Sequence, residues 1–429
     1  MRYATLPLLA GISLAAICCT DQSPVGPSLA PGVQATKVTT PGTGPWARVV
    51  EGETGPGSLY ALYIPTNWNG DAIYYAHGIR APLEPITLRD QDSLFKVRDL
   101  LGAQGYAFAY SSFSENGLAV KDGAQRTHQL RALLNSELPD EPERSYLAGN
   151  SLGALVALDV AERFPGHYDG VLAMCGMVGG TPRELQYIGD VRALFDYYYP
   201  GVLPGDVITP PATPLTIPEV QQRVVAAITA NPLGLYAIAS TAQTPLAFAP
   251  PNGNVGDPTS PAFQSLVGSL ITALYYQLLA IPDVLGRTHG HSPYDNRNTI
   301  YTMGTLVAPA PVPSALIASM IAASNGTPVA PGVTRYDITP DAENYLDKYY
   351  VPTGRLTIPV VSVHNFWDPL VPFFHEPAFA QITASAGASS MLLQRGVPNY
   401  GHCNFSTPLV VSSFQTLTNW VTTGVKPAA

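Results

Sequence analysis

The chain has 429 residues, of which 46% are apolar and only 12% are charged, and it contains 42 prolines. The apolar share can bury a sizeable core, which excludes a wholly disordered chain, and the length predicts one large domain with an insertion, or two domains. The net charge of −9 comes without any basic run, so duplex nucleic acid is not an expected partner.

Residues 1–19 have the pattern of an export signal. Arg2 precedes an apolar run over residues 4–17, which is shorter than the roughly 20 residues that a membrane-spanning helix needs. The run ends at Cys18 and Cys19 and resembles a bacterial lipoprotein signal, in which one such cysteine becomes lipidated. We therefore expect an exported protein. It would be a lipoprotein attached to a membrane only through an N-terminal lipid on Cys19 or Cys18, or a secreted or periplasmic protein.

The following segment, residues 20–45, is rich in proline and glycine and has no aromatic residue. Such a composition cannot bury enough apolar surface to fold, so it predicts a disordered tether. Only Cys175 and Cys403 remain beyond the signal. In an exported chain, two cysteines can form one disulfide.

Strand and helix patterns alternate beyond the tether, which predicts an α/β architecture with a mostly parallel sheet and helices on both faces. Short apolar runs predict strands at residues 48–50, 59–64, 72–76, 106–110, 145–148, 170–174, 359–364 and 390–394. Apolar residues at helical spacing predict helices at residues 93–105, 125–134, 152–164, 375–386 and 409–421.

The alternation stops over residues 181–350, where proline, alanine, tyrosine and threonine dominate and helix-like pieces occur at 263–279 and 313–323. It resumes afterwards. We therefore expect a core built from residues 46–180 and 351–429, interrupted by a large helical lid or cap insertion at 181–350.

The motif Gly149-Asn150-Ser151-Leu152-Gly153 lies between a predicted strand and a predicted helix. A nucleophile elbow needs such a sharp turn, which holds its serine in a strained conformation. The two glycines remove side chains that would clash where the strand and the helix cross. Ser151 would stand at the start of the helix, where the helix dipole favours developing negative charge. The alternative interpretation is a helix N-cap serine after a glycine turn.

A serine nucleophile needs a general base and an acidic residue that orients the base. Asp368 follows the predicted strand at 359–364, and His402 follows the next predicted helix and strand. Glu376 is the rival acid, and Asp368 could instead simply start a turn before Pro369.

Among the other histidines, His77 lies in a predicted loop, where a structural role is expected. His289-Gly290-His291 with Asp295 is a weak metal-ligand pattern that lacks a third clustered ligand. We expect no metal and no cofactor.

These motifs resemble the α/β-hydrolase family over residues 46–180 and 351–429. The resemblance rests on His77-Gly78, the elbow at 149–153, Asp368 in an Asp-Pro-Leu-Val-Pro run, and Gly401-His402. It implies the α/β-hydrolase fold with Ser151 as nucleophile, His402 as base and then acid, and Asp368 as the orienting residue.

The same resemblance implies an oxyanion hole formed by the backbone N–H groups of Leu152 and Ile79. The His402-Cys403 pair is also similar to that of tannases and fungal feruloyl esterases, in which this cysteine is bonded to a cysteine just before the nucleophile. Here Asn150 occupies that place.

The positions of Cys175 and Cys403 predict a disulfide between them. Cys175 closes the predicted strand at 170–174, whose carboxyl end faces the same side of the sheet as the elbow, and Cys403 follows His402, whose loop must reach that side. The bridge would hold the His402 loop in place. The alternative is two buried free thiols.

The chain is thus expected to be a serine esterase that cleaves carboxylic esters through an acyl-enzyme, with a small-molecule or polymeric ester as substrate. The aromatic insertion favours an apolar or aromatic acyl group, unless its aromatic residues form the insertion's own core. Two alternatives remain, a serine peptidase with prolyl-oligopeptidase-like triad order and a catalytically idle binding lipoprotein on the same fold. The oligomeric state is not predicted.

Overall fold

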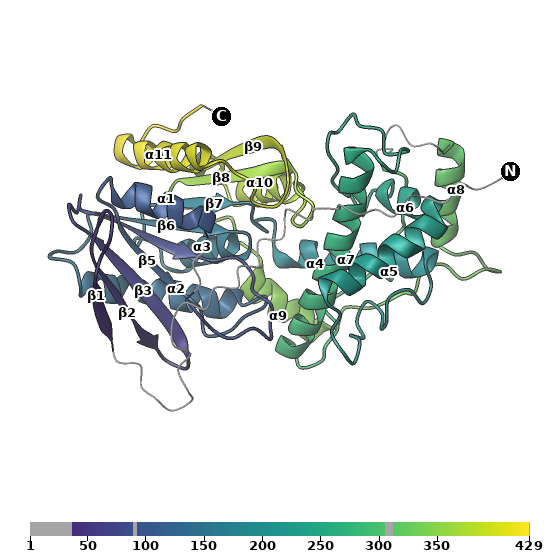
Figure 1. The fold of residues 1–429 in the computed structure, drawn as a ribbon, viewed down its shortest axis with the longest axis horizontal. Coiled ribbons are helices and arrows are strands. Elements are labelled where there is room, and N and C mark those ends of the chain that lie inside the picture. Colours follow the sequence, from purple (N-terminus) through teal and green to yellow (C-terminus); the bar gives the residue numbers. More distant parts are fainter. Residues whose placement is uncertain (1–36, 89–91, 305–311, 429) are drawn as a thin grey trace.

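The computed structural model describes residues 37–88, 92–304 and 312–428, and Figure 1 shows their arrangement. The predicted signal, with both of its cysteines, lies outside these ranges. A mixed sheet with helices on both faces forms one part of the molecule, and a group of helices lies beside it.

Within the described residues, nine strands form one sheet in the order β1-β2-β3-β5-β4-β6-β7-β8-β9. The strand pairs from β5 to β9 are parallel, whereas β1, β2 and β3 join antiparallel at one edge. The strands are β1 Val38–Pro41, β2 Trp46–Thr54, β3 Ser58–Pro65, β4 Asp71–Ala76, β5 Ala107–Ser111, β6 Arg144–Asn150, β7 Gly170–Met174, β8 Val360–Trp367 and β9 Leu392–Tyr400.

Two apolar layers cover the sheet, one on each face. All six residues of β4 are buried. Tyr74 packs into the layer that contains residues of α2 and α3, and its neighbour Tyr75 packs into the layer beneath α1 and α11. Burial on both faces explains why the central strands have continuous apolar runs instead of alternating ones. The flanking helices are α1 Asp92–Gly102, α2 Val120–Asn135, α3 Leu152–Arg163, α10 His375–Ser385 and α11 Thr407–Thr423.

The segment between β7 and β8 is helical, as expected for the insertion. Its helices pack mainly on one another, and α9 also contacts α2 of the core. The Tyr350 hydroxyl of α9 donates to the Leu118 carbonyl at 2.8 Å, which ties the end of the insertion to the core. The helices are α4 Thr181–Tyr198, α5 Ile217–Ala230, α6 Pro232–Ala239, α7 Pro261–Arg287, α8 Ser314–Ser324 and α9 Pro340–Tyr350.

The predicted tether at residues 20–45 includes a short segment that is folded onto the core. Val38–Pro41 form β1, which pairs antiparallel with β2 through Val38↔Glu51 and Thr40↔Val49. The composition of the whole segment hid this short run of β-branched residues, which has strong strand preference. All four residues of β1 are exposed, so only the pairing with β2 orders them.

Helix α7 is longer than the predicted 263–279 because it continues through Pro282. The final turns are anchored to the core, since Asp283 accepts a hydrogen bond from the Leu118 N–H at 2.7 Å. This helix is long and apolar enough to cross a membrane, but 67% of its most apolar window is buried inside the protein. A core helix of a folded domain passes the same test.

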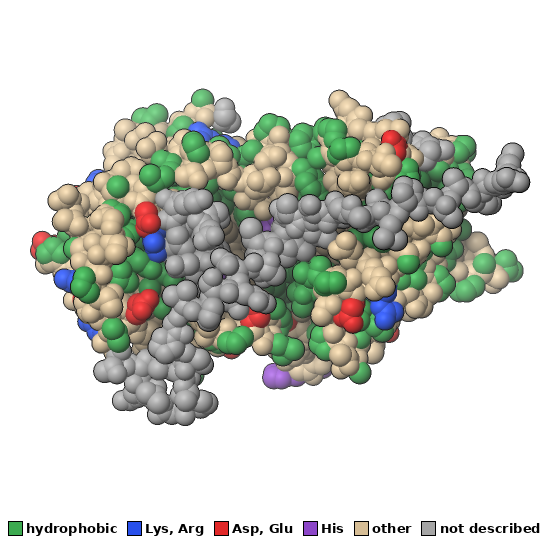
Figure 2. Space-filling view, viewed as in Figure 1, with side chains coloured by type: hydrophobic (Ala, Val, Ile, Leu, Met, Phe, Trp, Pro, Cys, Tyr) green, Lys and Arg blue, Asp and Glu red, His purple; other side chains and the backbone are tan. Residues whose placement is uncertain are grey.

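The face in Figure 2 carries few charged side chains. The Lys and Arg side chains visible there lie singly among hydrophobic and polar ones, in keeping with the 12% of charged residues in the chain.

A disulfide joins Cys175, directly after β7, to Cys403, beyond β9, with the two Cα atoms 5.2 Å apart. This is the predicted pairing. The bridge spans 228 residues of sequence and closes a loop that contains the entire insertion.

Replacing both Cys175 and Cys403 with Ala should lower the free energy of unfolding by about 2–4 kcal/mol, because the open chain gains freedom when unfolded. Urea unfolding of the oxidised wild type and the double variant measures this difference. Reduced wild type, unfolded in parallel, should behave as the double variant does. Equal stability of all three samples would contradict a structural role for the bridge.

Candidate active site

Ser151 lies in the turn between β6 and α3, and its backbone is strained. Its φ is 54° and its ψ is −122°, a region that side-chain-bearing residues rarely occupy and that clusters at functional sites. The side chain makes no capping hydrogen bond to the helix, which argues against the N-cap interpretation. The serine is buried, at 7% exposure.

The two glycines of the motif are required by close backbone contacts. A Cβ on Gly149 would lie 2.1 Å from the Gly153 carbonyl oxygen, and a Cβ on Gly153 would lie 2.0 Å from the Ala76 carbonyl oxygen. Real Cβ atoms do not approach other atoms this closely. The turn can therefore form only if both positions lack a side chain, as expected for a nucleophile elbow.

Strand pairing brings Asp368 and His402 side by side. Strands β8 and β9 remain paired as far as Trp367↔Tyr400, and the Gly401 N–H donates to the Trp367 carbonyl at 3.1 Å. Asp368 follows β8 directly, and His402 lies two residues after the end of β9. The register of the last parallel pair thus decides that these two side chains meet.

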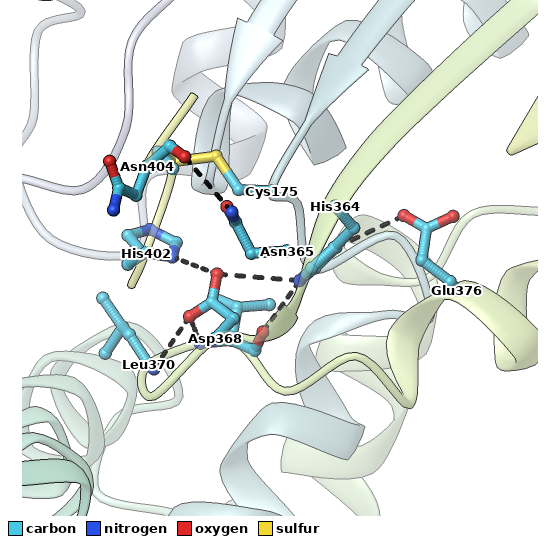
Figure 3. Close-up of a disulfide and its surroundings, with 10 residues drawn as sticks. Cys175, His364, Asn365, Asp368, Leu370, Glu376, His402 and Asn404 are labelled. Atoms are coloured by element: carbon cyan, nitrogen blue, oxygen red, sulfur yellow. Dashed lines mark hydrogen bonds and ion pairs between the residues drawn. A yellow bond between two sulfur atoms is a disulfide. The ribbon is translucent and has the colours of Figure 1, made fainter. Parts of the chain in front are cut away.

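A short hydrogen bond links the pair, since His402 Nδ1 lies 2.8 Å from Asp368 Oδ2 (Figure 3). An ionised carboxylate only accepts hydrogen bonds, so Nδ1 carries the proton and Nε2 is left as the acceptor. The other carboxylate oxygen, Oδ1, accepts from the N–H groups of Leu370 and Val371, each at 2.9 Å. The Asp368 side chain is fully buried, and the His402 side chain is 13% exposed.

Glu376, the rival acid, contacts His364 instead of His402, at 3.3 Å between Oε1 and Nδ1. The choice of Asp368 over Glu376 as the partner of His402 therefore agrees with the geometry.

Ser151 stands at the same edge of the sheet, although its hydroxyl makes no hydrogen bond to His402 among the described residues. Its N–H donates to the Met174 carbonyl at 2.9 Å. Met174 precedes Cys175, which is bonded to Cys403, the neighbour of His402. One backbone hydrogen bond and one disulfide thus connect the serine to the histidine loop. In unliganded structures, catalytic hydrogen bonds are often long and tighten only with substrate.

The disulfide lies directly beside the His402 ring. Both of its cysteines have positive φ, 46° for Cys175 and 51° for Cys403. Among the described residues, Cys175, His402 and Cys403 lie close enough together to hold a metal ion. The two cysteine sulfur atoms are, however, bonded to each other. The histidines at 289 and 291 form no such group within the described residues, and His291 lies 3.6 Å from Asp341 on the surface.

The loop after β4 passes next to the serine. A Cβ on Gly78 would lie 3.3 Å from Ser151 Cβ, so the backbone at this position contacts the elbow. His77 is buried and stacks on Phe113 with ring centroids 3.9 Å apart. Burial and the neighbouring Arg80 charge lower the pKa of His77 to about 3, so its ring is uncharged and serves packing.

The predicted oxyanion donors also lie in this region. Leu152 is the first residue of α3, where helix N–H groups have no partner within the helix. Ile79 directly follows Gly78 and is partly buried against the core. Their N–H groups as oxyanion donors remain a prediction.

Tyr400 is a site residue that the sequence pattern did not reveal. Its hydroxyl donates to the Ser265 carbonyl of α7 at 3.0 Å and lies 3.1 Å from Ser269 Oγ. The insertion therefore contacts the chain two residues before His402. A tyrosine near the end of an exposed edge strand carries no signal of such a distant partner.

The aromatic residues of the insertion mostly form its own core. Five aromatic residues of the insertion are buried: Phe195, Tyr199, Tyr236, Phe263 and Tyr276. A cavity of about 560 Å³ lies between α7 and the loops at 82–86 and 114–116. Ser151, Asp368 and His402 are not among its lining residues, so it does not define an acyl pocket.

The chain is similar to known hydrolases in sequence and in structure. A family model described as "Putative esterase" matches residues 107–211, a span that contains Ser151. A search of curated proteins finds no match.

Solved structures with low similarity include three esterases and lipases. A rice cell wall degrading esterase, LipA from Xanthomonas oryzae, is 14% identical with a TM-score of 0.40, covering 87% of this chain and 90% of the other. Feruloyl esterase B from Aspergillus oryzae is 13% identical with a TM-score of 0.45, and the match covers 89% of this chain and 82% of the esterase. Candida antarctica lipase A in its closed state is 15% identical with a TM-score of 0.43, and the match covers 92% of this chain and 83% of the lipase.

The described chain has a mostly parallel sheet with helices on both faces, a strand–Ser151–helix elbow, and an acid and a histidine after the last two strands. By these features, the chain has the predicted α/β-hydrolase fold.

Proposed function

We propose that this chain is a serine hydrolase that cleaves carboxylic esters through an acyl-enzyme, with Ser151 as nucleophile, His402 as general base and Asp368 as the residue that orients it. The buried hydrogen bond of 2.8 Å between Asp368 and His402 supports the proposal most directly, because it leaves His402 Nε2 free to accept a proton at the edge where Ser151 lies. The esterase family model, which matches residues 107–211 and so includes Ser151, supports ester hydrolysis as the reaction.

In the proposed reaction, His402 Nε2 takes the proton of Ser151 as the hydroxyl oxygen attacks the ester carbonyl carbon. The N–H groups of Leu152 and Ile79 would stabilise the resulting oxyanion. His402 then gives its proton to the leaving alcohol, and an acyl-enzyme remains. Water, deprotonated by the same ring, hydrolyses it and restores the serine.

The Asp368 carboxylate suits its role because hydrogen bonds orient both of its oxygens. Three hydrogen bonds hold its two oxygens, and its negative charge stabilises the imidazolium that forms at His402 during each transfer. The substrate is proposed at the level of a small-molecule or polymeric ester.

Replacing Ser151 with Ala should abolish ester hydrolysis while leaving the fold intact, with kcat reduced by about 10⁴–10⁶-fold. Short- and long-chain chromogenic esters, together with a serine-directed phosphonate probe, measure turnover and labelling. Circular dichroism serves as the folding control. Labelling of the variant at the wild-type rate would contradict the assignment, and cleavage of an aminoacyl amide in preference to every ester would favour a peptidase.

The rate should rise with pH along one acidic limb, because only the neutral His402 ring can accept the serine proton. His77 and His375 should not contribute. The pKa of His77 is lowered to about 3, and burial lowers that of His375 well below its ordinary value. Profiles of kcat/KM between about pH 5 and pH 9 test this expectation. A flat profile would count against a histidine base.

We also propose that the protein is exported and lipidated at Cys19 or Cys18. This rests on the sequence pattern of residues 1–19. Replacing both cysteines with Ala in the full chain should release the protein from the membrane fraction or leave it unprocessed. Mass spectrometry of the wild type, extracted with detergent, should find a diacylglyceryl-modified cysteine. Wild-type protein confined to the soluble fraction would overturn this proposal.

A further inference from the structure

Asp368 lies between two imidazoles, of which only His402 has a place in the proposed reaction. On the other side, His364 Nε2 is 3.7 Å from Asp368 Oδ2, the same oxygen that accepts the hydrogen bond from His402 (Figure 3). His364 belongs to β8 and its side chain is fully buried. His364 precedes Asp368 in the chain, which is the wrong order for the base of a Ser–Asp–His triad.

Hydrogen bonds hold the His364 ring in a single orientation. Nε2 donates to the Val371 carbonyl at 2.8 Å, and Nδ1 lies 3.3 Å from Glu376 Oε1. The Val371 N–H donates in turn to Asp368 Oδ1. Val371 thus binds the ring of His364 through its carbonyl and the carboxylate of Asp368 through its N–H.

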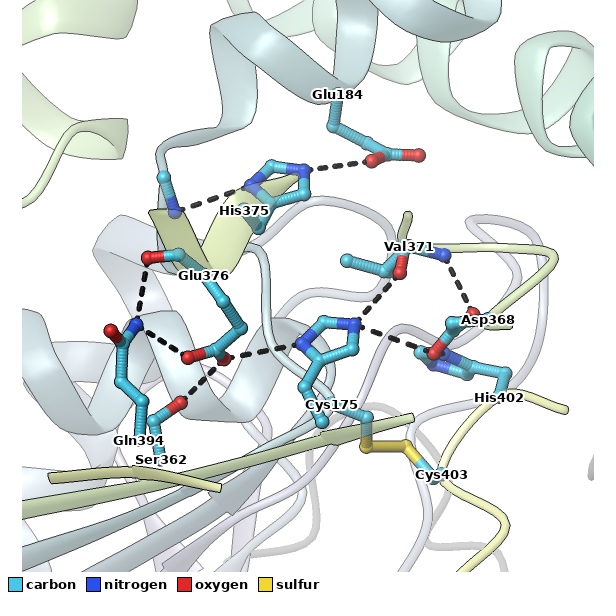
Figure 4. A network of polar contacts seen from close by, with 12 residues as sticks. Cys175, Glu184, Ser362, Asp368, Val371, His375, Glu376, Gln394, His402 and Cys403 are labelled. Carbon is cyan, nitrogen blue, oxygen red and sulfur yellow. Dashed lines mark hydrogen bonds and ion pairs between the residues drawn. A yellow bond between two sulfur atoms is a disulfide. The ribbon is translucent and has the colours of Figure 1, made fainter. Parts of the chain in front are cut away.

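Glu376 is itself fixed from two sides, as Figure 4 shows. Ser362 Oγ donates to Oε1 at 2.6 Å, and Gln394 Nε2 donates to Oε2 at 2.6 Å. Glu376 is 3% exposed. A buried carboxylate held this way has a fixed position, so the His364 ring can turn toward solvent only by breaking the network.

The geometry favours a positive charge on His364. Each of its nitrogens faces an acceptor, an arrangement that satisfies both only when both carry protons. Burial alone lowers the pKa of His364, but the hydrogen bond and charge of Glu376, together with the charge of Asp368, raise it overall. A cation on His364 between the buried carboxylates of Asp368 and Glu376 offsets part of the cost of burying these two negative charges.

The remaining titratable groups nearby do not supply that cation. His375 of α10 accepts a hydrogen bond from the Gly179 N–H at Nδ1 and lies 3.0 Å from Glu184 of α4 at Nε2. Burial, with the charges of His364 and Arg183, lowers the pKa of His375 well below its ordinary value. Burial also raises the pKa of Glu184 well above the ordinary value.

We propose that His364 is a positioning residue for the proposed Ser151–His402–Asp368 machinery: anchored by Glu376 and the Val371 carbonyl, it fixes the Asp368 carboxylate and places a positive charge behind it. This inference rests on the proposed function. A cation on the far side of Asp368 weakens the hold of the carboxylate on the His402 proton.

The test compares His364→Gln with His375→Gln in purified full-length enzyme. Glutamine keeps a neutral donor of similar reach but removes the charge. For His364→Gln we expect the acidic midpoint of the kcat/KM profile to move upward by about one pH unit. We also expect kcat at neutral pH to fall about tenfold while KM changes little. His375→Gln, a matched loss of a buried but uncharged histidine, should leave the midpoint in place. An unchanged midpoint in folded His364→Gln overturns the proposal.

Glu376→Gln provides a second variant if His364→Gln does not fold. It removes the carboxylate that holds the His364 proton and should shift the midpoint in the same direction by a smaller amount. A midpoint at the wild-type value or below it would also overturn the proposal.

An activity-independent measurement separates this inference from the proposed function. The ring resonances of His402, followed by NMR against pH in Ser151→Ala and in the Ser151→Ala, His364→Gln double variant, report the His402 charge without turnover. An upward shift of the titration in the double variant supports the positioning role even if the wild type cleaves no ester. Identical titrations would reject it even if the wild type is an active esterase.

Discussion

A carboxylate removed from water must find its hydrogen bonds and its counter-charge inside the protein, because a buried ion left unpaired is destabilising by several kcal/mol. Asp368 is such a group, and the surrounding structure is arranged around this requirement. The turn that follows it supplies two N–H groups, one strand supplies an imidazole four residues earlier in the chain, and the loop after the neighbouring strand supplies another. Since all of these partners approach from fixed backbone, the carboxylate has one available position, and so has the ring of His402.

The same edge of the sheet carries concentrated backbone strain. Ser151, Cys175 and Cys403 all have positive φ, a conformation that is unfavourable by about 1–3 kcal/mol for each non-glycine residue. The parallel pairing of β6, β7 and β8 holds the first two, and the disulfide holds the third by joining it to the second. Such strain persists only where the surrounding packing determines the conformation. Here it orients the serine side chain and places the histidine loop against the central strands.

Much of this arrangement could be predicted from local signals. The elbow was recognisable because the steric demand of a crossing strand and helix allows only glycine at 149 and 153. Asp368 was recognisable because a strand buried on both faces ends just before it. The end of β9 could not be predicted, because its last residues are largely exposed at the sheet edge and lack an apolar pattern. The contacts of His364 and Tyr400 depend on residues brought together only by tertiary packing, which no spacing along the chain encodes.

The contact between Tyr400 and α7 couples the position of the insertion to the segment that leads to His402. The Tyr400 hydroxyl is bonded to the Ser265 carbonyl within the long helix of the insertion, and its backbone lies two residues before the general base of the proposed reaction. If α7 moves away from the core, it must either break this bond or carry the end of β9 with it. A displacement of α7 would thus change the position of the His402 ring through the end of β9.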